Sequence, residues 1–357
     1  MPSLKGIALE ILALPREAGT PEAAQARELV TKYLTGLGYT VVTQSFTFPP
    51  SSLRAFPIFG AGLGGLALVL LPFLASDSLP RWAALAVWMM GLMALAIVAA
   101  GVGLGWVHLG EGLREDANLI ATRGQGAPRR WVVAHLDSKA QGHSMAGRLV
   151  AVWIVGVAVV ALTALAVGRL SAGPLSLGLA APGAILAILA GFLAGRGRLS
   201  GRSHGARDNG TGVVAVLAAA SAPDSTVGIL ITGAEEFGLV GARVFARHST
   251  GMAGTEFVNV DTVDQEGKLY LVSHDAAGER LARAVEPQLA GLGLPMQRRR
   301  LPLGIFVDSA PLARLAPSVT VGRLTWRTLR RIHTAADTTA GLSFRTAEQV
   351  GKAIASN

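Results

Sequence analysis

Carboxylates and histidines that can act together in catalysis are concentrated in five short segments of this 357-residue chain. Most of these segments lie at the boundary of an expected strand or helix, where α/β folds place reactive side chains. The chain has no cysteine, so any metal must be bound by His, Asp or Glu rather than by a thiolate. The segments are residues 133–137, 207–210, 233–238, 258–261 and 333–337.

The side chains in these segments match the ligands of a pair of zinc ions. Two zinc ions about 3.5–4 Å apart need a bridging ligand, with histidine and carboxylate ligands on each ion. Asp208 is the candidate bridge. The other candidate ligands are His135, Glu236, Asp261 and His333.

Adjacent Glu235 and Glu236 are expected to have different roles. Neighbouring side chains do not present both carboxylates to one ion in the same orientation. One therefore binds metal, while the other faces the substrate and accepts a proton from the attacking water. Asp137 and Asp337 are candidates to orient a zinc-bound histidine, which usually donates its second N–H to a carboxylate, a carbonyl or water. The spacing leaves open which Asp serves which histidine, if either does.

Taken together, these motifs resemble those of the co-catalytic zinc aminopeptidases, which share a fold with glutamate carboxypeptidases and glutaminyl cyclases. The resemblance covers everything outside the hydrophobic segments described below. The matching pieces are His-Leu-Asp (135–137), Asp-Asn-Gly-Thr-Gly (208–212), Glu-Glu-Phe-Gly-Leu-Val-Gly (235–241), Asn-Val-Asp (259–261), Asp-Ser (308–309) and His-Thr-Ala-Ala-Asp-Thr (333–338).

The resemblance implies a metallo-aminopeptidase that removes N-terminal residues from peptides. It implies His135 and Asp261 on different zinc ions, Asp208 between the ions and Glu235 as the general base, with Asp137 orienting His135. Two zinc ions per chain would be held by His135, Asp208, Glu236, Asp261 and His333.

Two other functions on the same fold stay open. A one-zinc aminoacyl cyclase does not require His135 and Asp261 as ligands, and a non-catalytic binding domain typically loses its metal ligands. The presence of all five ligands and Glu235 favours hydrolysis. Ile332 stands where many relatives have a tyrosine that helps to stabilise the oxyanion, so one electrophilic contact differs.

Composition points to a membrane protein, because 51% of residues are hydrophobic, the mean hydropathy is +0.46 and only 15% are charged. A soluble domain carries about a quarter charged residues. Four uncharged runs form two helical hairpins, and each is long enough to cross the roughly 30 Å hydrocarbon core. Their lack of charge argues against a transporter. The runs are residues 55–75 and 82–107, then 149–168 and 170–195 joined around Arg169.

Outside the hairpins, short apolar strands alternate with helices, as in strand 227–232 after helix 212–220. This alternation favours a mixed, mostly parallel sheet covered on both faces. The predicted fold is a three-layer α/β zinc-peptidase domain interrupted by two transmembrane hairpins. The expected domains are a discontinuous peptidase domain (1–54, 108–147 and 196–357) and hairpins at 55–107 and 148–195.

An even number of spans places both termini and all catalytic segments on one side of the membrane. The loops on the opposite side offer only Arg81 and Arg169. The positive-inside rule then predicts a cytoplasmic catalytic domain. The flanking cations on that side are Arg54, Arg114, Arg148, Arg196, Arg198 and Arg202.

The expected partners are a peptide substrate and a lipid bilayer. The net charge of +9 does not indicate nucleic acid, because no binding motif accompanies it and only 6% of residues are aromatic. The sequence leaves the oligomeric state and the preferred substrate side chain open.

Overall fold

The computed structural model describes residues 3–110, 112–124, 126–222, 227–302 and 304–356. The chain forms two compact units. Unit 1 contains residues 1–48, 113–140 and 201–357, and unit 2 contains residues 49–112 and 141–200. The two insertions that make unit 2 therefore interrupt unit 1 twice along the sequence.

Unit 1 is built on a mixed sheet, in which the described residues form eight strands in the order β1-β2-β4-β3-β5-β8-β6-β7. The central strands β4, β3, β5 and β8 are parallel to one another, as are β6 and β7, and antiparallel pairs occur at β1–β2, β2–β4 and β6–β8. The strands are β1 (Thr40–Phe48), β2 (Arg114–Thr122), β3 (Arg130–His135), β4 (Gly228–Thr232), β5 (Glu256–Val263), β6 (Lys268–Ser273), β7 (Met296–Arg300) and β8 (Ser318–Leu324).

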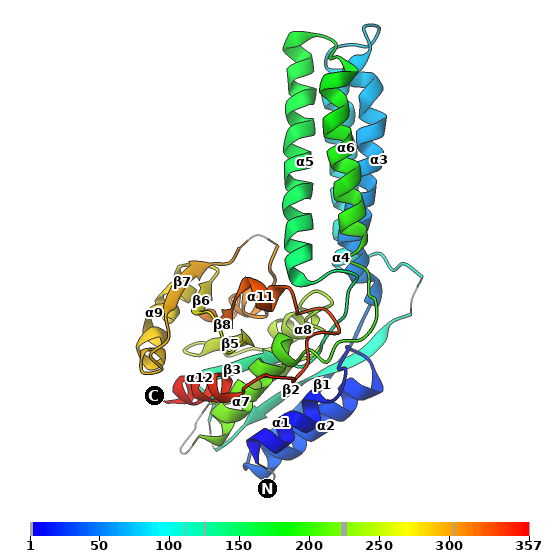
Figure 1. Ribbon diagram of the computed structural model, residues 1–357. Helices are drawn as coiled ribbons and strands as arrows, with labels where there is room; N and C mark the ends of the chain where they lie inside the picture. The colour runs from blue at the N-terminus through cyan, green and yellow to red at the C-terminus, as the bar shows by residue number, and fades with distance from the viewer. Residues whose placement is uncertain (1–2, 111, 125, 223–226, 303, 357) are drawn as a thin grey trace. The chain divides into compact units, whose positions relative to one another are not determined.

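Helices cover both faces of this sheet (Figure 1). Side chains alternate across the strands, so Val132 packs in the core with one helical layer while Val133 packs with Phe245 and Leu312 in the other. The predicted three-layer α/β fold is confirmed. One layer contains α1 (Leu4–Leu12), α2 (Pro21–Gly36), α7 (Thr211–Ser221), α9 (Ala276–Ala290) and α12 (Arg345–Ala355); the other contains α8 (Val240–His248) and α10 (Ser309–Leu312).

Local sequence explains where the unit 1 helices begin and how closely they pack. Thr20 caps α2 by accepting a hydrogen bond from the Ala23 amide at 3.3 Å, with Pro21 in the first turn. Helix α7 consists largely of small and β-branched residues that are buried. A Cβ on Gly351 would lie 1.9 Å from the Ala215 carbonyl, so only glycine lets α12 approach α7 this closely.

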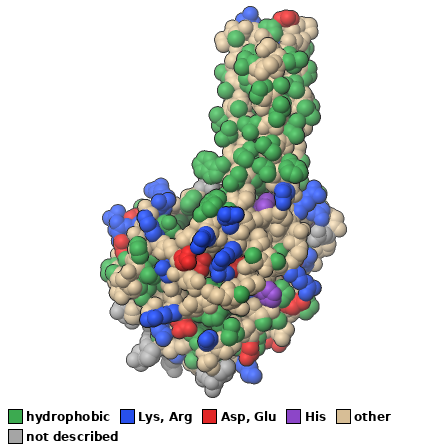
Figure 2. All heavy atoms as spheres, viewed as in Figure 1, with side chains coloured by type: hydrophobic (Ala, Val, Ile, Leu, Met, Phe, Trp, Pro, Cys, Tyr) green, Lys and Arg blue, Asp and Glu red, His purple; other side chains and the backbone are tan. Residues whose placement is uncertain are grey.

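Unit 2 is a bundle of four long helices that run side by side, preceded by the short turn η1 (Pro50–Arg54) (Figure 1). All four are long and apolar enough to cross a membrane, and the face in Figure 2 is hydrophobic along them. Their inner sides meet in one core that includes Leu63, Trp88 and Leu162. The helices are α3 (Ala55–Ala75), α4 (Ala83–Gly103), α5 (Met145–Ala172) and α6 (Leu177–Gly195).

The break between the last two helices differs from the sequence-based expectation. Arg169 does not lie in the connecting loop: it belongs to the last turn of α5, which ends at Ala172 and is followed by the C-cap Gly173 with a φ of +80°. The Arg169 side chain is buried and donates to the carbonyls of Phe73, Ser76 and Leu79 at the end of the first hairpin. These carbonyls accept from Nε and Nη2, which helps a cation to be tolerated inside this helix, while Nη1 is buried without a hydrogen-bond partner among the described residues.

Candidate metal centre

The predicted site residues meet at the carboxyl ends of the central parallel strands, where open α/β sheets place ligand sites. His135 is the last residue of β3, and Asp261 lies near the end of β5. Glu235 and Glu236 lie in the turn that follows β4. The other two ligand candidates come from irregular segments: Asp208 from η2 (Ala206–Gly210), and His333 from the segment after α11 (Trp326–Leu329).

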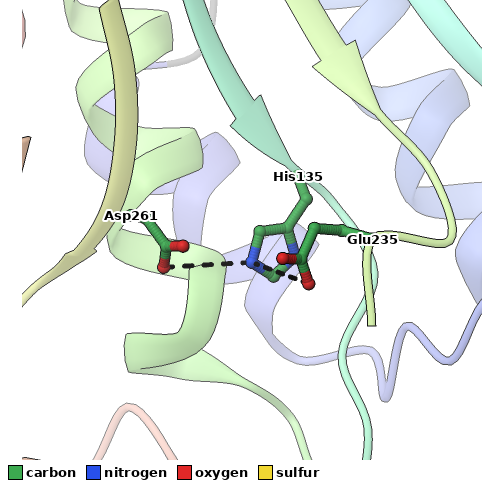
Figure 3. A group of neighbouring side chains, drawn as sticks. All are labelled: His135, Glu235 and Asp261. Atoms are coloured by element: carbon green, nitrogen blue, oxygen red, sulfur yellow. Dashed lines mark ion pairs between the residues drawn. The ribbon is translucent and has the colours of Figure 1, made fainter. Parts of the chain in front are cut away.

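These six side chains form two groups whose candidate ligand atoms lie within 4.8 Å of one another. The first group is His135, Glu235 and Asp261, shown in Figure 3. His135 Nε2 lies 4.0 Å from both Glu235 Oε2 and Asp261 Oδ1. The second group is Asp208, Glu236 and His333.

Asp208 connects the two groups, because it directs one carboxylate oxygen to each histidine. Its Oδ1 lies 3.3 Å from His135 Nε2, and its Oδ2 lies 3.1 Å from His333 Nε2. Glu236 Oε1 lies 3.2 Å from the same His333 nitrogen. A carboxylate that faces two histidine groups with its two oxygens has the arrangement of a bridging metal ligand.

The pairing of His135 with Asp261 corrects one expectation. The resemblance placed these residues on different ions, whereas the structure puts both in the first group. The reason is the sheet order: β3 and β5 are adjacent and parallel, so side chains at their carboxyl ends point to the same place.

The backbone around the site adopts unusual conformations that the sequence did not predict. Ala234, Thr262 and His333 have φ values of +50°, +56° and +65°, in the left-handed region that non-glycine residues rarely enter. Ala234 precedes Glu235, Thr262 follows Asp261, and His333 is itself a candidate ligand. Such conformations cost about 1–3 kcal/mol each and persist where the surrounding structure enforces them, commonly at functional sites.

Asp137 and Asp337 both accept hydrogen bonds from backbone amides beside a ligand. The Asp137 carboxylate accepts from the amides of Glu235 and Glu236 at 3.0 and 3.1 Å, and the backbone carbonyl of Asp137 lies 3.0 Å from His135 Nδ1. The Asp337 carboxylate accepts from the amides of Arg207 and Asp208 at 2.9 and 3.1 Å. Each Asp therefore fixes a ligand-bearing segment from a distant part of the chain.

Sequence reasoning missed a lysine that contacts the site. Lys139 is buried, and its Nζ lies 2.6 Å from Glu236 Oε2, opposite the oxygen that faces His333. No periodic pattern marks Lys139 as a site residue. The one signal in the sequence is its position two residues after the His-Leu-Asp motif. The ion pair between buried Arg207 and the Asp264 carboxylate, at 3.3 Å, was also missed, because no local pattern indicates it.

Burial shapes the acidity of the site. It raises the pKa of Glu235 well above the ordinary value, with further increase from the carboxylates of Glu236, Asp308 and Asp261. Burial and the nearby Asp208 raise the pKa of Asp261 to about 7. For Glu236, the charges of His333 and Lys139 outweigh burial and lower the pKa to about 2.

The donors present fit zinc. Four carboxylates and two histidines converge here, and Asp208, Glu235 and Glu236 are each at most 8% exposed. Lys139 is the one lysine or arginine in ion-pair contact with the two groups among the described residues. Glu236 Oε1 is buried and makes no hydrogen bond within the described parts of the chain. Buried carboxylates in this excess require further positive charge, and histidine with carboxylate is a donor set that zinc prefers.

Comparison with known proteins agrees with this donor set. Residues 186–357, which contain four of the five ligand candidates and Glu235, match the model of peptidase family M28. No curated protein matches the chain in sequence.

Solved structures share the fold at low sequence identity. An aminopeptidase from Aneurinibacillus sp. strain AM-1 is 15% identical, with a TM-score of 0.57 over 98% of this chain and 92% of its own. A zinc aminopeptidase from Bacillus subtilis is 15% identical, with a TM-score of 0.57 over 99% and 93%. A glutaminyl cyclase from Fimbriiglobus ruber is 15% identical, with a TM-score of 0.55 over 98% and 91%.

These findings confirm the resemblance seen in the sequence. The fold is that of zinc aminopeptidases and glutaminyl cyclases, and the peptidase family match supports the predicted class of zinc-dependent exopeptidase. Residues 186–357, the C-terminal part of the chain, match peptidase family M28.

Proposed function

We propose that this protein is a membrane-anchored aminopeptidase that removes N-terminal residues from peptides with two zinc ions. The observation that carries the proposal is the position of Asp208, whose two carboxylate oxygens face His135 and His333 separately. With Asp208 shared, the first ion would be held by His135 and Asp261 and the second by Glu236 and His333.

Glu235 has the position and the environment of a general base. Zinc held by these groups would supply Lewis-acid chemistry, activating the attacking water and polarising the peptide carbonyl. Glu235 accepts a proton from the attacking water and returns it to the leaving amine as the C–N bond breaks. Burial raises the pKa of Glu235 well above its ordinary value, so its carboxylate holds an accepted proton more readily than an exposed glutamate does.

The decisive test compares the wild type with Glu235→Gln in detergent-purified protein. Glutamine keeps the shape of the side chain but cannot accept the proton. We expect about two zinc ions per chain in both proteins, and loss of ~10²–10⁴-fold in kcat for an aminoacyl reporter in the variant. Glu28→Gln, on the exposed side of α2, is the matched control and should change neither value. A variant with full activity would remove Glu235 from the mechanism, and a wild type without zinc would favour a binding domain.

One feature favours a second candidate, a one-zinc aminoacyl cyclase. The group of Asp208, Glu236 and His333 is buried and offers three ligands without His135 or Asp261. A peptide with N-terminal glutamine separates the two functions. An aminopeptidase releases free glutamine, whereas a cyclase releases ammonia and leaves a pyroglutamyl peptide. Pyroglutamyl product with one zinc per chain would establish the cyclase.

We infer that unit 2 anchors the protein in a lipid bilayer as four spans, with unit 1 in the cytoplasm. The apolar length of the four helices supports the spans, and the flanking arginines support the orientation. Because the chain has no cysteine, Ser78→Cys in the α3–α4 link and Gln25→Cys on α2 each carry a single thiol. In intact cells an impermeant maleimide should label Cys at 78 only. The opposite pattern would reverse the orientation, and equal labelling would exclude spanning.

A further inference from the structure

Arg16 has a buried guanidinium that touches both segments flanking the second insertion into unit 1. The residue lies between α1 and α2 and is 0% exposed. Its Nε donates to the Leu136 carbonyl at 2.8 Å, directly after His135. Its Nη1 and Nη2 donate to the carbonyls of His204 and Gly205 at 2.6 and 3.0 Å, just before Asp208.

Ser138 extends this connection through its hydroxyl. The Arg16 amide donates to Ser138 Oγ at 3.0 Å, and the Ser138 amide donates to the Arg16 carbonyl at 3.0 Å. Ser138 Oγ in turn donates to the Ser203 carbonyl at 2.8 Å. A Cβ on Gly205 would lie 2.5 Å from that of Ser138, so the two segments approach as closely as glycine permits. Arg16, Ser138 and Ser203 are called the Arg16 clamp below.

The chemistry of the clamp requires arginine. A guanidinium offers five N–H donors in a planar fork, whereas a lysine ammonium is a single point that cannot reach carbonyls on two segments in this geometry. Burial lowers the pKa of Arg16 to about 10, and the carboxylates of Asp337, Asp137 and Asp208 oppose that change. The side chain therefore stays charged at neutral pH, and its described hydrogen bonds all go to backbone carbonyls.

We propose that Arg16 is a positioning residue that sets the separation of His135 and Asp208 across the inserted hairpin. Residues 139–202 separate the two clamped segments in sequence, so chain connectivity alone does not hold them together. The 3.3 Å approach of His135 Nε2 to Asp208 Oδ1 depends on how these segments sit against each other. The inference deepens the proposed two-zinc function and rests on it.

The test uses full-length Arg16→Lys, with Arg130→Lys as the matched control. Arg130 begins β3, at the opposite end of the strand from His135, and binds Glu256, Gln288 and the Ile354 carbonyl at 2.5–2.8 Å. For Arg16→Lys we expect a ~10–100-fold loss of zinc affinity in chelator competition and a ~10²-fold loss of kcat with little change in KM. Arg130→Lys should lower the melting temperature and leave zinc affinity and kcat unchanged.

Hydrogen exchange on the zinc-free proteins tests the clamp without metal or activity. Arg16→Lys should speed exchange of peptides from residues 134–140 and 201–210, and Arg130→Lys should not. Ser138→Ala, which removes only a hydroxyl, should show the same pattern more weakly.

Millimolar guanidinium should partly restore kcat to Arg16→Ala, since a cavity of about 190 Å³ lined by Pro15, Ser138 and Ser203 adjoins the clamp.

Each outcome decides the proposal. Unchanged exchange in Arg16→Lys would overturn the clamp. Faster exchange with normal zinc affinity and kcat would show that Arg16 stabilises the fold without positioning the ligands. If the wild type binds no zinc and cleaves no peptide, the proposed function fails, and the exchange result alone then decides whether Arg16 holds the two segments together.

Discussion

The two halves of the metal centre hold their ligands in different ways. In the first group, the histidine is fixed: His135 Nδ1 lies 3.0 Å from the Asp137 carbonyl. The proposed carboxylate ligand of this group, Asp261, is held less firmly. It accepts a hydrogen bond from the Thr262 hydroxyl at 3.0 Å, and 15% of its side chain is exposed. This half is preorganised mainly through its histidine.

The second group shows the reverse. His333 Nδ1 is buried and has no hydrogen-bond partner among the described residues, whereas Glu236 is fixed by Lys139 at 2.6 Å. The lysine leaves Glu236 Oε1 directed to His333 and adds a positive charge beside the group. The two halves should therefore bind zinc with different affinities, because different kinds of contact orient their ligands.

The largest effect is expected from Asp208→Asn, because this change acts on both halves. A neutral amide cannot bridge two zinc ions, and each ion supplies several kcal/mol of transition-state stabilisation. We expect at most one zinc per chain by elemental analysis and a loss of ~10³-fold or more in kcat. Asp275→Asn, at the N-cap of α9, is the control and should keep both zinc ions. Two retained zinc ions in Asp208→Asn would show that the halves are independent.

Removing one histidine at a time separates the halves. His135→Ala and His333→Ala should each lower the zinc content to about one per chain. Either change should reduce peptide hydrolysis by roughly 10²- to 10³-fold, the equivalent of several kcal/mol. The informative exception is His135→Ala: full activity with unchanged zinc content would mean that the second group works alone, as in a one-zinc cyclase.

Lys139→Met tests the contact that distinguishes the second group. Outer partners of metal ligands typically contribute 10–100-fold in metal affinity, so we expect ~10–100-fold weaker zinc binding at one site and unchanged binding at the other. Chelator titration with two resolved affinities measures this. Lys352→Met, exposed on α12, is the control. Tighter binding in Lys139→Met would mean that repulsion between the ammonium and zinc outweighs the orienting contact.

A smaller effect is expected from pH in chelator-treated protein. Burial raises the pKa of Asp261 to about 7 and that of Asp337 to about 6, so folding favours their protonated forms. Their contribution to stability is complete below the unfolded pKa near 4 and is lost as pH rises through 6 to 7. The melting temperature should therefore fall between pH 5 and pH 8, and saturating zinc should reduce that fall. If the melting temperature of the zinc-free protein rises between pH 5 and pH 8, the raised pKa values of Asp261 and Asp337 are contradicted.

Much of the site could be predicted because its candidate ligands lie in short sequence motifs. His135, Asp208, Glu235, Glu236, Asp261 and His333 are named by residue type and order, and the four long helices follow from uninterrupted hydrophobicity. Strands such as β4 follow from short apolar runs. By contrast, β7 reads Met-Gln-Arg-Arg-Arg, with no apolar alternation, because it is an edge strand that, among the described strands, pairs with β6 alone.

The set of candidate ligands, the hydrophobic hairpins and the α/β class could thus be read from the amino-acid sequence, because each depends on residues close together in the chain. Which ligands share a group, and which contacts orient them, became apparent only from the folded chain. His135 joins Asp261 because β3 and β5 are neighbours, and Lys139 meets Glu236 across the turn after β4. Arg16 meets Leu136 and Gly205 across more than a hundred residues. Such contacts leave no local pattern, since they arise only when distant segments pack together.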